Sequence, residues 1–378
     1  MTARTIKAVW LGMVTFVWLC LTGMLSAAGA AEATEPKAGG VTSIEDRMRH
    51  LEEAIGRTGE GDRWYDRLQI SGLIEVEAGY EKIDFGDPAE EDEKTSDVDV
   101  STVELALDIK IVDHVDGHVL FKYEEDDVFM DEGFITLTGT EAFPAYLIAG
   151  RQYIPFGNYD SHFVTDPTTL ILGETNQGAV VAGYRFGGET VDVAVGAFNA
   201  RAQKTGDDDV INSFVASVAV NPLEGLTFGA SYTSNLASSD SFNEAVVDPD
   251  NLDSLVGGWS AFVSYAFLER FKIIGEYVAA LDPFKAGEIY DASDTKERDV
   301  SAWNLELGAM IIDSLELAVR YGGSDDGGND FLPKTQYGVV VNWGLFENTN
   351  LALEYLRNKY EDDFQDVDAL TVQLAIAF

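Results

Sequence analysis

Apolar and polar residues alternate along most of this chain, from Leu68 to Phe378. Because neighbouring side chains of a β-strand point to opposite faces, each alternating segment predicts a strand with one apolar and one polar face. About sixteen segments recur, most of them near the ~9–11 residues that a tilted strand needs to cross a membrane. One of them carries Tyr146 and Ile148 on its apolar face, which is expected to be the outer one. After the N-terminal region, no apolar run reaches the length of a membrane-spanning helix, so any membrane crossing must use strands.

The connections between these segments alternate in length. Short turns, such as residues 114–117 and 313–314, separate longer polar loops, such as residues 83–96, 234–254, 282–299 and 322–333. A brief link at residues 125–132 lies on the same side as these loops. Short turns on one rim and long loops on the other are typical of outer-membrane barrels. The sequence therefore predicts an all-β fold, a transmembrane antiparallel β-barrel of about sixteen strands. An even number of strands places both ends of the barrel on the short-turn, periplasmic side.

A soluble β-sandwich is the structural alternative, because its strands also alternate. Tyr and Trp near the strand ends, and an unbroken meander without a Greek-key crossing, favour the barrel. The last alternating segment closes on the aromatic residue Phe378. We expect Phe378 to act as the assembly signal that the barrel-assembly machinery reads.

The N-terminus has the pattern of a cleaved secretory signal. Arg4 and Lys7 precede an apolar stretch, and small residues with A-x-A spacing follow at Ala28 and Ala30. We expect residues 1–30 to be the signal peptide, 31–63 a linker with a short helix, and 64–378 the barrel. A retained membrane helix is the alternative. A lipid anchor on Cys20 is disfavoured because the bulky Leu19 precedes it.

A short helix is predicted at residues 42–57, where Thr42 and Glu45 have the spacing of a capping box. Its apolar positions form a coiled-coil seam: Ile44, Met48, Leu51 and Ile55. Two heptads are marginally stable alone, so the seam favours association between protomers and a homotrimer. A helix that packs against its own barrel is the alternative.

The charge is strongly acidic, with 25 Lys and Arg against 66 Asp and Glu. This composition excludes a nucleic-acid partner, because phosphate binding needs clustered basic residues. The hydrophobic content of 46% and aromatic content of 11% argue against a disordered acidic chain. The one cysteine, Cys20, lies inside the expected signal peptide, so the mature protein is expected to have no thiol, which excludes disulfide frameworks, thiolate metal sites and cysteine nucleophiles.

The residues opposite the apolar faces should line a water-filled lumen, because a barrel of this size encloses a channel rather than a packed core. An acidic excess there should enrich cations and repel anions, and mixed charge should create a transverse field. The alternative is that the charges pair along a solvated wall. The candidates are Glu75, Glu77, Glu104, Asp108, Lys110, Lys122, Glu124, Arg151, Arg185, Asp192, Lys272, Glu276, Glu306, Glu316, Arg320 and Glu354.

Residues 154–177 form a loop with unusually many apolar residues, including Phe156, Phe163 and Leu172. Such a loop could fold into the barrel and narrow it, or pack on the rim or on a neighbouring protomer. If it enters the barrel, four side chains are expected to face solute: Asp160, His162, Asp166 and Glu174.

The stretch GRQYIPFG at residues 150–157, with Asp166-Pro167, Leu170 and Gly173-Glu174-Thr175 downstream, resembles the LbtU-type siderophore porin family. The order of signal, short coiled coil and sixteen-stranded barrel is similar over the whole chain, whereas the motif covers about thirty residues. The resemblance implies passage of an iron-chelating siderophore across the outer membrane. The segment before the barrel is too short for the plug of energised siderophore receptors, which implies passive transport.

Enzymatic and metal-binding interpretations are weak, and we expect neither an enzyme nor a cofactor or metal site. Ser161 adjoins His162, but sequence neighbours on a loop rarely form a relay. His114 and His118 flank a turn, where a metal site is a remote alternative. Acidic loops such as residues 325–330 favour solvation over binding of Ca²⁺ or of lipopolysaccharide through divalent ions.

The sequence as a whole predicts a Gram-negative outer-membrane porin for passive diffusion of small solutes, with a ferric siderophore as one candidate cargo. Its expected partners are outer-membrane lipid, lipopolysaccharide, the assembly machinery and the solute. Two alternatives stay open. One is a general or carbohydrate-type porin, and the other is a structural protein that links the outer membrane to the cell wall through residues 42–57.

Overall fold

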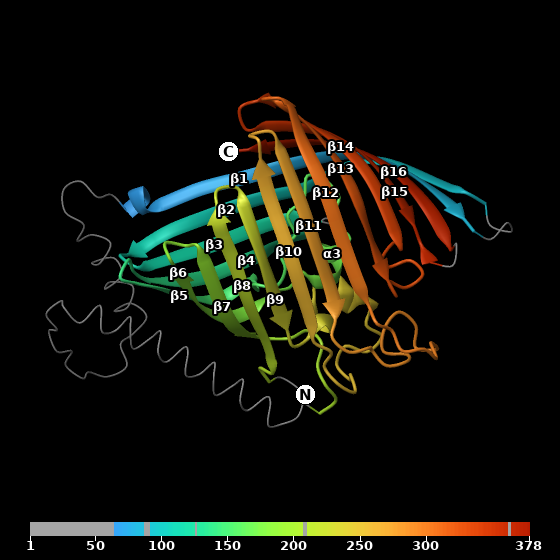
Figure 1. The fold of residues 1–378 in the computed structure, drawn as a ribbon, viewed down its shortest axis with the longest axis horizontal. Helices are drawn as coiled ribbons and strands as arrows, with labels where there is room; N and C mark the ends of the chain where they lie inside the picture. The colour runs from blue at the N-terminus through green and yellow to red at the C-terminus, as the bar shows by residue number, and fades with distance from the viewer. Residues whose placement is uncertain (1–63, 87–90, 125–126, 207–209, 362–363) are drawn as a thin grey trace, which may run out of the picture.

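The computed structural model describes residues 64–86, 91–124, 127–206, 210–361 and 364–378 (Figure 1). The expected signal peptide and the seam of Ile44, Met48, Leu51 and Ile55 lie outside the described residues. A single turn of 3-10 helix, η1 (Trp64–Arg67), leads into the first strand.

Sixteen antiparallel strands close into one barrel in which each strand pairs with its neighbours in sequence and β1 pairs with β16. This confirms the predicted all-β barrel and its strand number. The strands are β1 (Leu68–Phe85), β2 (Glu93–Val112), β3 (Val115–Glu124), β4 (Asp127–Thr140), β5 (Phe143–Tyr153), β6 (Asn176–Phe186), β7 (Val191–Phe198), β8 (Ser213–Leu223), β9 (Leu226–Thr233), β10 (Gly258–Phe267), β11 (Phe271–Ala280), β12 (Ser301–Ile312), β13 (Leu315–Asp325), β14 (Thr335–Phe346), β15 (Thr349–Lys359) and β16 (Gln365–Ala377).

The barrel closes where its first and last strands meet. Gly72 and Phe378 exchange two backbone hydrogen bonds of 2.9 and 3.0 Å. A Cβ on Gly72 would overlap the Phe378 ring, so glycine leaves room for the terminal aromatic side chain. The start of β1 and the end of β16 therefore share one rim, as an even strand number requires. Whether Phe378 is an assembly signal stays a prediction.

The outer face carries the apolar half of the alternation. On β12, Leu305 and Leu307 are 51% and 42% exposed, while the intervening Glu306 is buried inside the barrel. Aromatic side chains pair across neighbouring strands near both ends of this belt, as with Trp259 and Tyr277 at the long-loop end, and Phe267 and Phe271 at the short-turn end. Such an apolar belt with aromatic borders suits a lipid environment.

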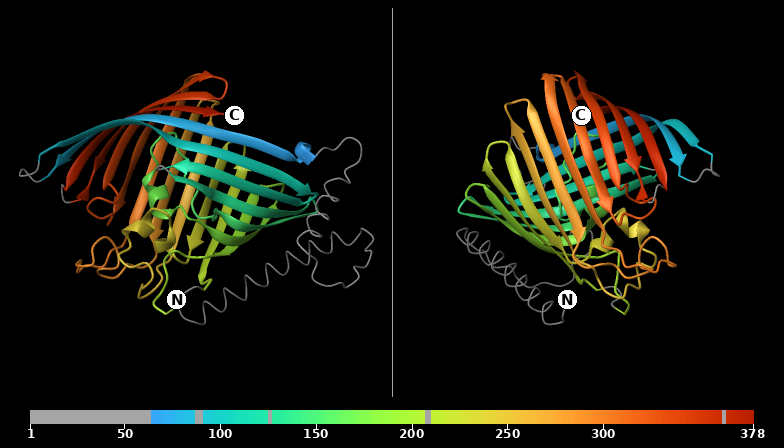
Figure 2. Two further views of the ribbon diagram at one scale, coloured as in Figure 1. Left: turned by 180° about the vertical axis from the view of Figure 1, so that it is seen from behind. Right: turned by 45° about the vertical axis from the view of Figure 1, so that its right-hand side comes forward.

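The hairpin of β1 and β2 is longer than the sequence pattern indicated. Residues 83–96 were expected to be a loop, but β1 continues to Phe85 and β2 begins at Glu93. The reason is that Val98 and Val100 continue the alternation between the charged Asp97 and Asp99. The hairpin projects beyond β3 on the long-loop rim, whereas β16 pairs with β1 as far as Phe85 (Figures 1 and 2).

Short helical pieces occur between strands: α3 (Thr168–Gly173), η2 (Leu236–Ser238) and η3 (Phe242–Ala245). Among the described residues, no helix is both long enough and apolar enough to cross a membrane. The α3 helix lies within the outline of the barrel (Figure 1), and its position determines the geometry of the lumen.

Candidate functional site: the barrel lumen and its inner segment

Residues 154–175, called the inner segment below, fold into the barrel instead of packing on its rim. The segment is closed at its neck by a 3.0 Å hydrogen bond from the Ile154 amide to the Thr175 carbonyl. Its apolar side chains Phe156 and Leu172 are buried against the inner wall. Gly157 adopts φ +76°, and a Cβ there would overlap the Tyr159 ring, so this bend requires glycine. Of the two alternatives for this loop, the inward position is the one observed.

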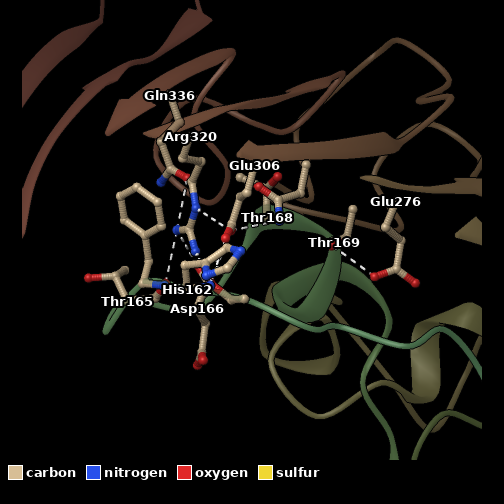
Figure 3. A network of polar contacts seen from close by, with 12 residues as sticks. His162, Thr165, Asp166, Thr168, Thr169, Glu276, Glu306, Arg320 and Gln336 are labelled. Carbon is tan, nitrogen blue, oxygen red and sulfur yellow. Dashed lines mark hydrogen bonds and ion pairs between the residues drawn. The ribbon is translucent and has the colours of Figure 1, made fainter. Parts of the chain in front are cut away.

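The first anchor of the inner segment is Glu276 on β11. Its two carboxylate oxygens accept hydrogen bonds from the backbone amides of Asn158 (2.8 Å) and Tyr159 (2.9 Å). The Ser260 hydroxyl donates to the same carboxylate at 3.1 Å, and Thr169 of α3 approaches it at 3.5 Å (Figure 3). Charge-assisted bonds of this kind are stronger than neutral ones, so Glu276 fixes the start of the segment.

The second anchor is the pair of Glu306 on β12 and Arg320 on β13, joined at 2.9 Å with both side chains fully buried. Glu306 accepts from the His162 amide at 2.7 Å and from the Ser161 hydroxyl at 3.0 Å. Arg320 donates to Ser161 Oγ and to the Thr165 carbonyl, and its guanidinium lies 4.2 Å from the centre of the Phe163 ring (Figure 3).

The third anchor is Glu354 on β15. It accepts from the Val164 amide at 2.6 Å, from the Thr165 amide at 3.2 Å and from the Thr165 hydroxyl at 2.6 Å. Phe163 packs beside it against Ala318, Val340, Ala352 and Leu356 of the inner wall. The segment is therefore held from β11 to β15 by buried charges and an apolar contact.

These anchors correct part of the sequence interpretation. Glu276, Glu306, Arg320 and Glu354 point into the barrel as their positions in the alternation predict, but they do not line open water. Their exposures are 7%, 1%, 3% and 1% because the inner segment covers them. Burial without partners would be costly, and the amides and hydroxyls of the segment supply those partners.

The tip of the inner segment reaches side chains near the short-turn rim. The Asp160 carboxylate forms a 3.0 Å ion pair with Lys272. His162 Nδ1 lies 3.0 Å from Glu316, but its side chain is only 6% exposed and packs against Gly308. His162 is therefore a buried contact of the wall and does not face solute as expected.

Asp166 and Glu174 remain accessible on the inner segment. Enclosure by the barrel raises the pKa of Asp166, whereas the nearby Arg320 and Lys122 act in the opposite direction. Enclosure, reinforced by the negative charges of Asp166 and Asp240, raises the pKa of Glu174 to about 8. Glu174 is consequently largely protonated at neutral pH.

The inner faces of β1, β2 and β3 stay open to the lumen. The residues expected there are partly or fully exposed: Glu75, Glu77, Glu104, Asp108, Lys110, Lys122 and Glu124. Lys122 Nζ lies 3.1 Å from Glu124, and Lys110 lies 3.5 Å from Asp113. Some of these charges pair with one another, as expected if they only form a solvated wall. The acidic side chains on the wall are nevertheless more numerous than the basic ones.

Sequence reasoning missed a cluster on this wall. His118 Nδ1 lies 2.7 Å from Asp108, and its ring stacks on Phe134 with centroids 4.9 Å apart. His118 Nε2 is 3.7 Å from Glu132, a residue that the sequence pattern had placed in a loop. The alternation on β3 places His118 on the polar, inward face, and this position was the sequence feature that could have indicated the cluster. Within the part of the chain that the structure describes, no group of three or more potential ligands is arranged to hold a metal ion.

The remaining predicted lumen residues lie apart from this wall. Arg185 and Asp192 pair at 3.3 Å, and Tyr146 donates to Asp192 at 2.8 Å with Arg185 over its ring. Tyr146 therefore faces inward, although the alternation had placed it on the outer face. Arg151 is half-buried at the end of β5 and donates to the Asp131 carbonyl at 2.9 Å.

A packed apolar core occupies the long-loop half of the barrel under β6–β13, which corrects the expectation of a wholly aqueous interior. The loops after β7, β9, β11 and β13 supply most of it. Phe242, Phe284 and Leu332 are completely buried there, with Tyr290 and Phe331 packed against them. These residues were assigned to polar loops because acidic and small residues surround them in sequence.

Comparison with known proteins gives relatives and a fold. No family model matches the chain. It is 26% identical over 309 residues to a UPF0422 protein of Coxiella burnetii and 22% identical over 325 residues to UPF0422 protein lpl2888 of Legionella pneumophila. Each match covers 76% of this chain but only 63% and 58% of the relatives, so the chain spans less than two thirds of their length.

Solved outer-membrane proteins share the fold. The outer membrane channel DcaP of Acinetobacter baumannii superposes with a TM-score of 0.58 at 15% identity, over 82% of this chain and 97% of that one. The anion-selective porin of Comamonas acidovorans gives 0.55 at 12% identity, over 82% and 99%. The trimer form of OmpT from Vibrio cholerae gives 0.53 at 12% identity, over 83% and 100%.

Proposed function

We propose that this protein is an outer-membrane porin through which small solutes diffuse passively. The observation that carries the proposal is the inner segment, which three sets of buried charges hold inside a closed barrel with an apolar outer belt. A wall of accessible charged residues on β1–β3 faces it. This arrangement leaves a polar route beside a fixed constriction, which is what a diffusion channel requires.

The charges of the route favour cations and neutral solutes over anions. Glu75, Glu77 and Glu104 on the wall, and Asp166 on the inner segment, outnumber the accessible Lys110 and Lys122. Negative charge along a narrow aqueous path raises the local concentration of cations. The fold does not fix this preference, since a barrel of similar shape is described as anion-selective in Comamonas acidovorans.

A swelling assay on proteoliposomes tests the porin function. Vesicles that contain the purified protein should swell in isosmotic solutions of uncharged solutes, faster for erythritol than for larger sugars. Vesicles with heat-denatured protein are the control. Equal swelling of the two preparations would exclude a channel and leave the structural alternative, an anchor between outer membrane and cell wall.

Siderophore passage is a second candidate, which the motif at residues 150–157 supports. In the structure, this motif forms the end of β5 and the entrance of the inner segment. The acidic wall disfavours anionic chelates and is compatible with neutral or cationic ones. Uptake of radiolabelled iron–siderophore should fall in a deletion strain and return on complementation; unchanged uptake in the deletion strain would remove this cargo and keep the general porin.

We also propose that the protein is a homotrimer exported with a cleaved signal. A solved barrel of the same fold is described as a trimer form, and the predicted seam of residues 42–57 provides a contact between protomers. Light scattering on the detergent-solubilised protein should give three chains per particle, and N-terminal sequencing should begin near residue 31. A variant lacking residues 42–57 that keeps three chains would exclude the seam as the trimer contact.

A further inference from the structure

The interior of the barrel is divided into two sectors. Inward residues of β9–β13, such as Ser260, Val278 and Ala302, are completely buried under the inner segment and the long loops. Inward residues of β1–β3, such as Glu104 and Asp108, are partly or fully exposed. A solute that crosses this barrel must therefore pass between the wall of β1–β3 and the accessible side of the inner segment.

Lys122 occupies a central place in this open sector. It lies on the inner face of β3, opposite Phe129 of β4 and Glu104 of β2 in the strand register. Its ammonium group is 3.1 Å from Glu124, and its charge also acts on Glu75 and Glu104 of the wall.

On the inner segment, Asp166 is accessible and Glu174 is half-buried. Burial raises the pKa of both carboxyls, and the Lys122 charge acts in the opposite direction on each. Arg320 is fully buried beneath the segment, whereas the Lys122 side chain, although also paired with a carboxylate, is 18% exposed. A positive group on one side of the route therefore faces carboxyl groups on the other.

We propose that Lys122 is the specificity-determining residue of the passage, and that it favours dipolar solutes, those that carry both an ammonium and a carboxylate group, such as amino acids and short peptides. This inference rests on the proposed porin function. The carboxylate of such a solute is attracted to Lys122 while its ammonium group is attracted to Asp166 or to the wall acids. An uncharged sugar gains neither contact, and a dicarboxylate meets the acidic excess.

Ion selectivity in planar bilayers tests the role of the Lys122 charge. One elementary charge at a distance of about 7 Å in water changes the local ion concentration about twofold to threefold. Lys122→Gln should therefore raise the permeability ratio of K⁺ to Cl⁻ by about that factor, whereas Asp166→Asn should lower it. Lys285→Gln is the matched control, because Lys285 lies in the loop after β11, where it is exposed and pairs with Asp253, and it is not part of the wall of β1–β3. Equal ratios for Lys122→Gln and Lys285→Gln would overturn the assignment.

Proteoliposome swelling tests the solute class with two probes of similar size. γ-Aminobutyrate is dipolar without net charge, and erythritol is uncharged. The rate for γ-aminobutyrate relative to erythritol should exceed one for the wild type and for Lys285→Gln, and should fall for Lys122→Gln. A ratio that Lys122→Gln leaves unchanged would overturn the proposal while the porin function stands. Absence of swelling with erythritol in the wild type would instead reject the porin function itself.

Discussion

The buried Arg320 is the residue on which several contacts of the inner segment converge. It pairs with Glu306 and binds Ser161 and the Thr165 carbonyl, all away from water. Burying two charges is costly, and their attraction compensates only when the remaining donors and acceptors are satisfied. Here the inner segment satisfies them, so the pair and the segment stabilise each other.

Removing one partner of this pair should be strongly destabilising. Arg320→Met leaves Glu306 buried without its counter-charge, and we expect a loss of about 3–5 kcal/mol in the free energy of unfolding. Denaturant unfolding in detergent micelles, followed by tryptophan fluorescence, measures it. The double variant Arg320→Met with Glu306→Gln should recover part of the loss. Exposed ion pairs contribute about 1 kcal/mol or less. If the free energy of unfolding of Arg320→Met lay within about 1 kcal/mol of the wild-type value, that result would contradict the burial of these charges.

The protonation of Glu174 makes ion selectivity depend on pH. Its raised pKa of about 8 means that the carboxyl is neutral below that value and ionised above it. The permeability ratio of K⁺ to Cl⁻ should therefore rise, about twofold to threefold, between pH 7 and pH 9. Glu174→Gln should flatten this rise in planar bilayers. The same increase in the variant would assign the titration to another group.

At the scale of single residues, the sequence predicts which side chains face inward but not which of them meet water. Glu306 follows the alternation of β12, yet its contact with Ser161 joins residues 145 positions apart. Whether a distant loop covers an inward side chain depends on the path of that loop, and the two-residue alternation of a strand carries no information about that path. Tyr146 was assigned to the wrong face because β5 carries apolar residues at both parities.

The inner segment lies inside the barrel, and its anchors are distributed over several strands. Glu276 binds the Asn158 amide, and Glu354 binds Thr165 further along the segment. A segment held at separate points should move as a unit only when more than one anchor is lost.

Loss of two anchors should widen the passage. In Glu276→Gln with Glu354→Gln, the charge-assisted bonds to the backbone amides are replaced by weaker neutral ones. We expect a larger and noisier single-channel conductance than in the wild type. Glu347→Gln, in a short turn outside the lumen, is the control. A conductance equal to that of the control would indicate that the inner segment does not limit the route.

The two sectors of the interior predict a pattern of chemical accessibility. The only cysteine of the chain is Cys20, so a cysteine introduced into the barrel is the only thiol after that position. Glu77→Cys and Asp108→Cys should react with a water-soluble methanethiosulfonate and reduce conductance, whereas Ser260→Cys and Asn304→Cys should be protected. Rapid reaction at Ser260→Cys would show that water enters the sector under β9–β13.

At the scale of elements, strands are predictable because their alternation is local, and the connections are not. The sixteen strands follow from period two and from turn residues. The core of the long loops could not be predicted, because Phe242, Phe284 and Leu332 are separated in sequence and flanked by polar residues. The apolar residues within 154–177 indicated that this segment is buried. They did not indicate whether it is buried inside the barrel, on the rim or against a neighbouring protomer.

The whole molecule is a closed barrel with an apolar outer belt, and its interior has a dry sector and a wet sector. The wet sector lies between β1–β3 and the inner segment, and its charge is negative. The acidic composition of the sequence predicts the sign of this charge, because Asp and Glu outnumber Lys and Arg at the inward positions as they do in the whole chain. The restriction of the route to one side follows only from the packing of the loops.

Single-channel recording in planar bilayers, under a KCl gradient, tests this account most directly. The purified protein should insert in discrete conductance steps, and the current should reverse at a potential on the cation-selective side. An absence of steps, or a reversal potential on the anion-selective side, would contradict a negatively charged, water-filled route through the barrel.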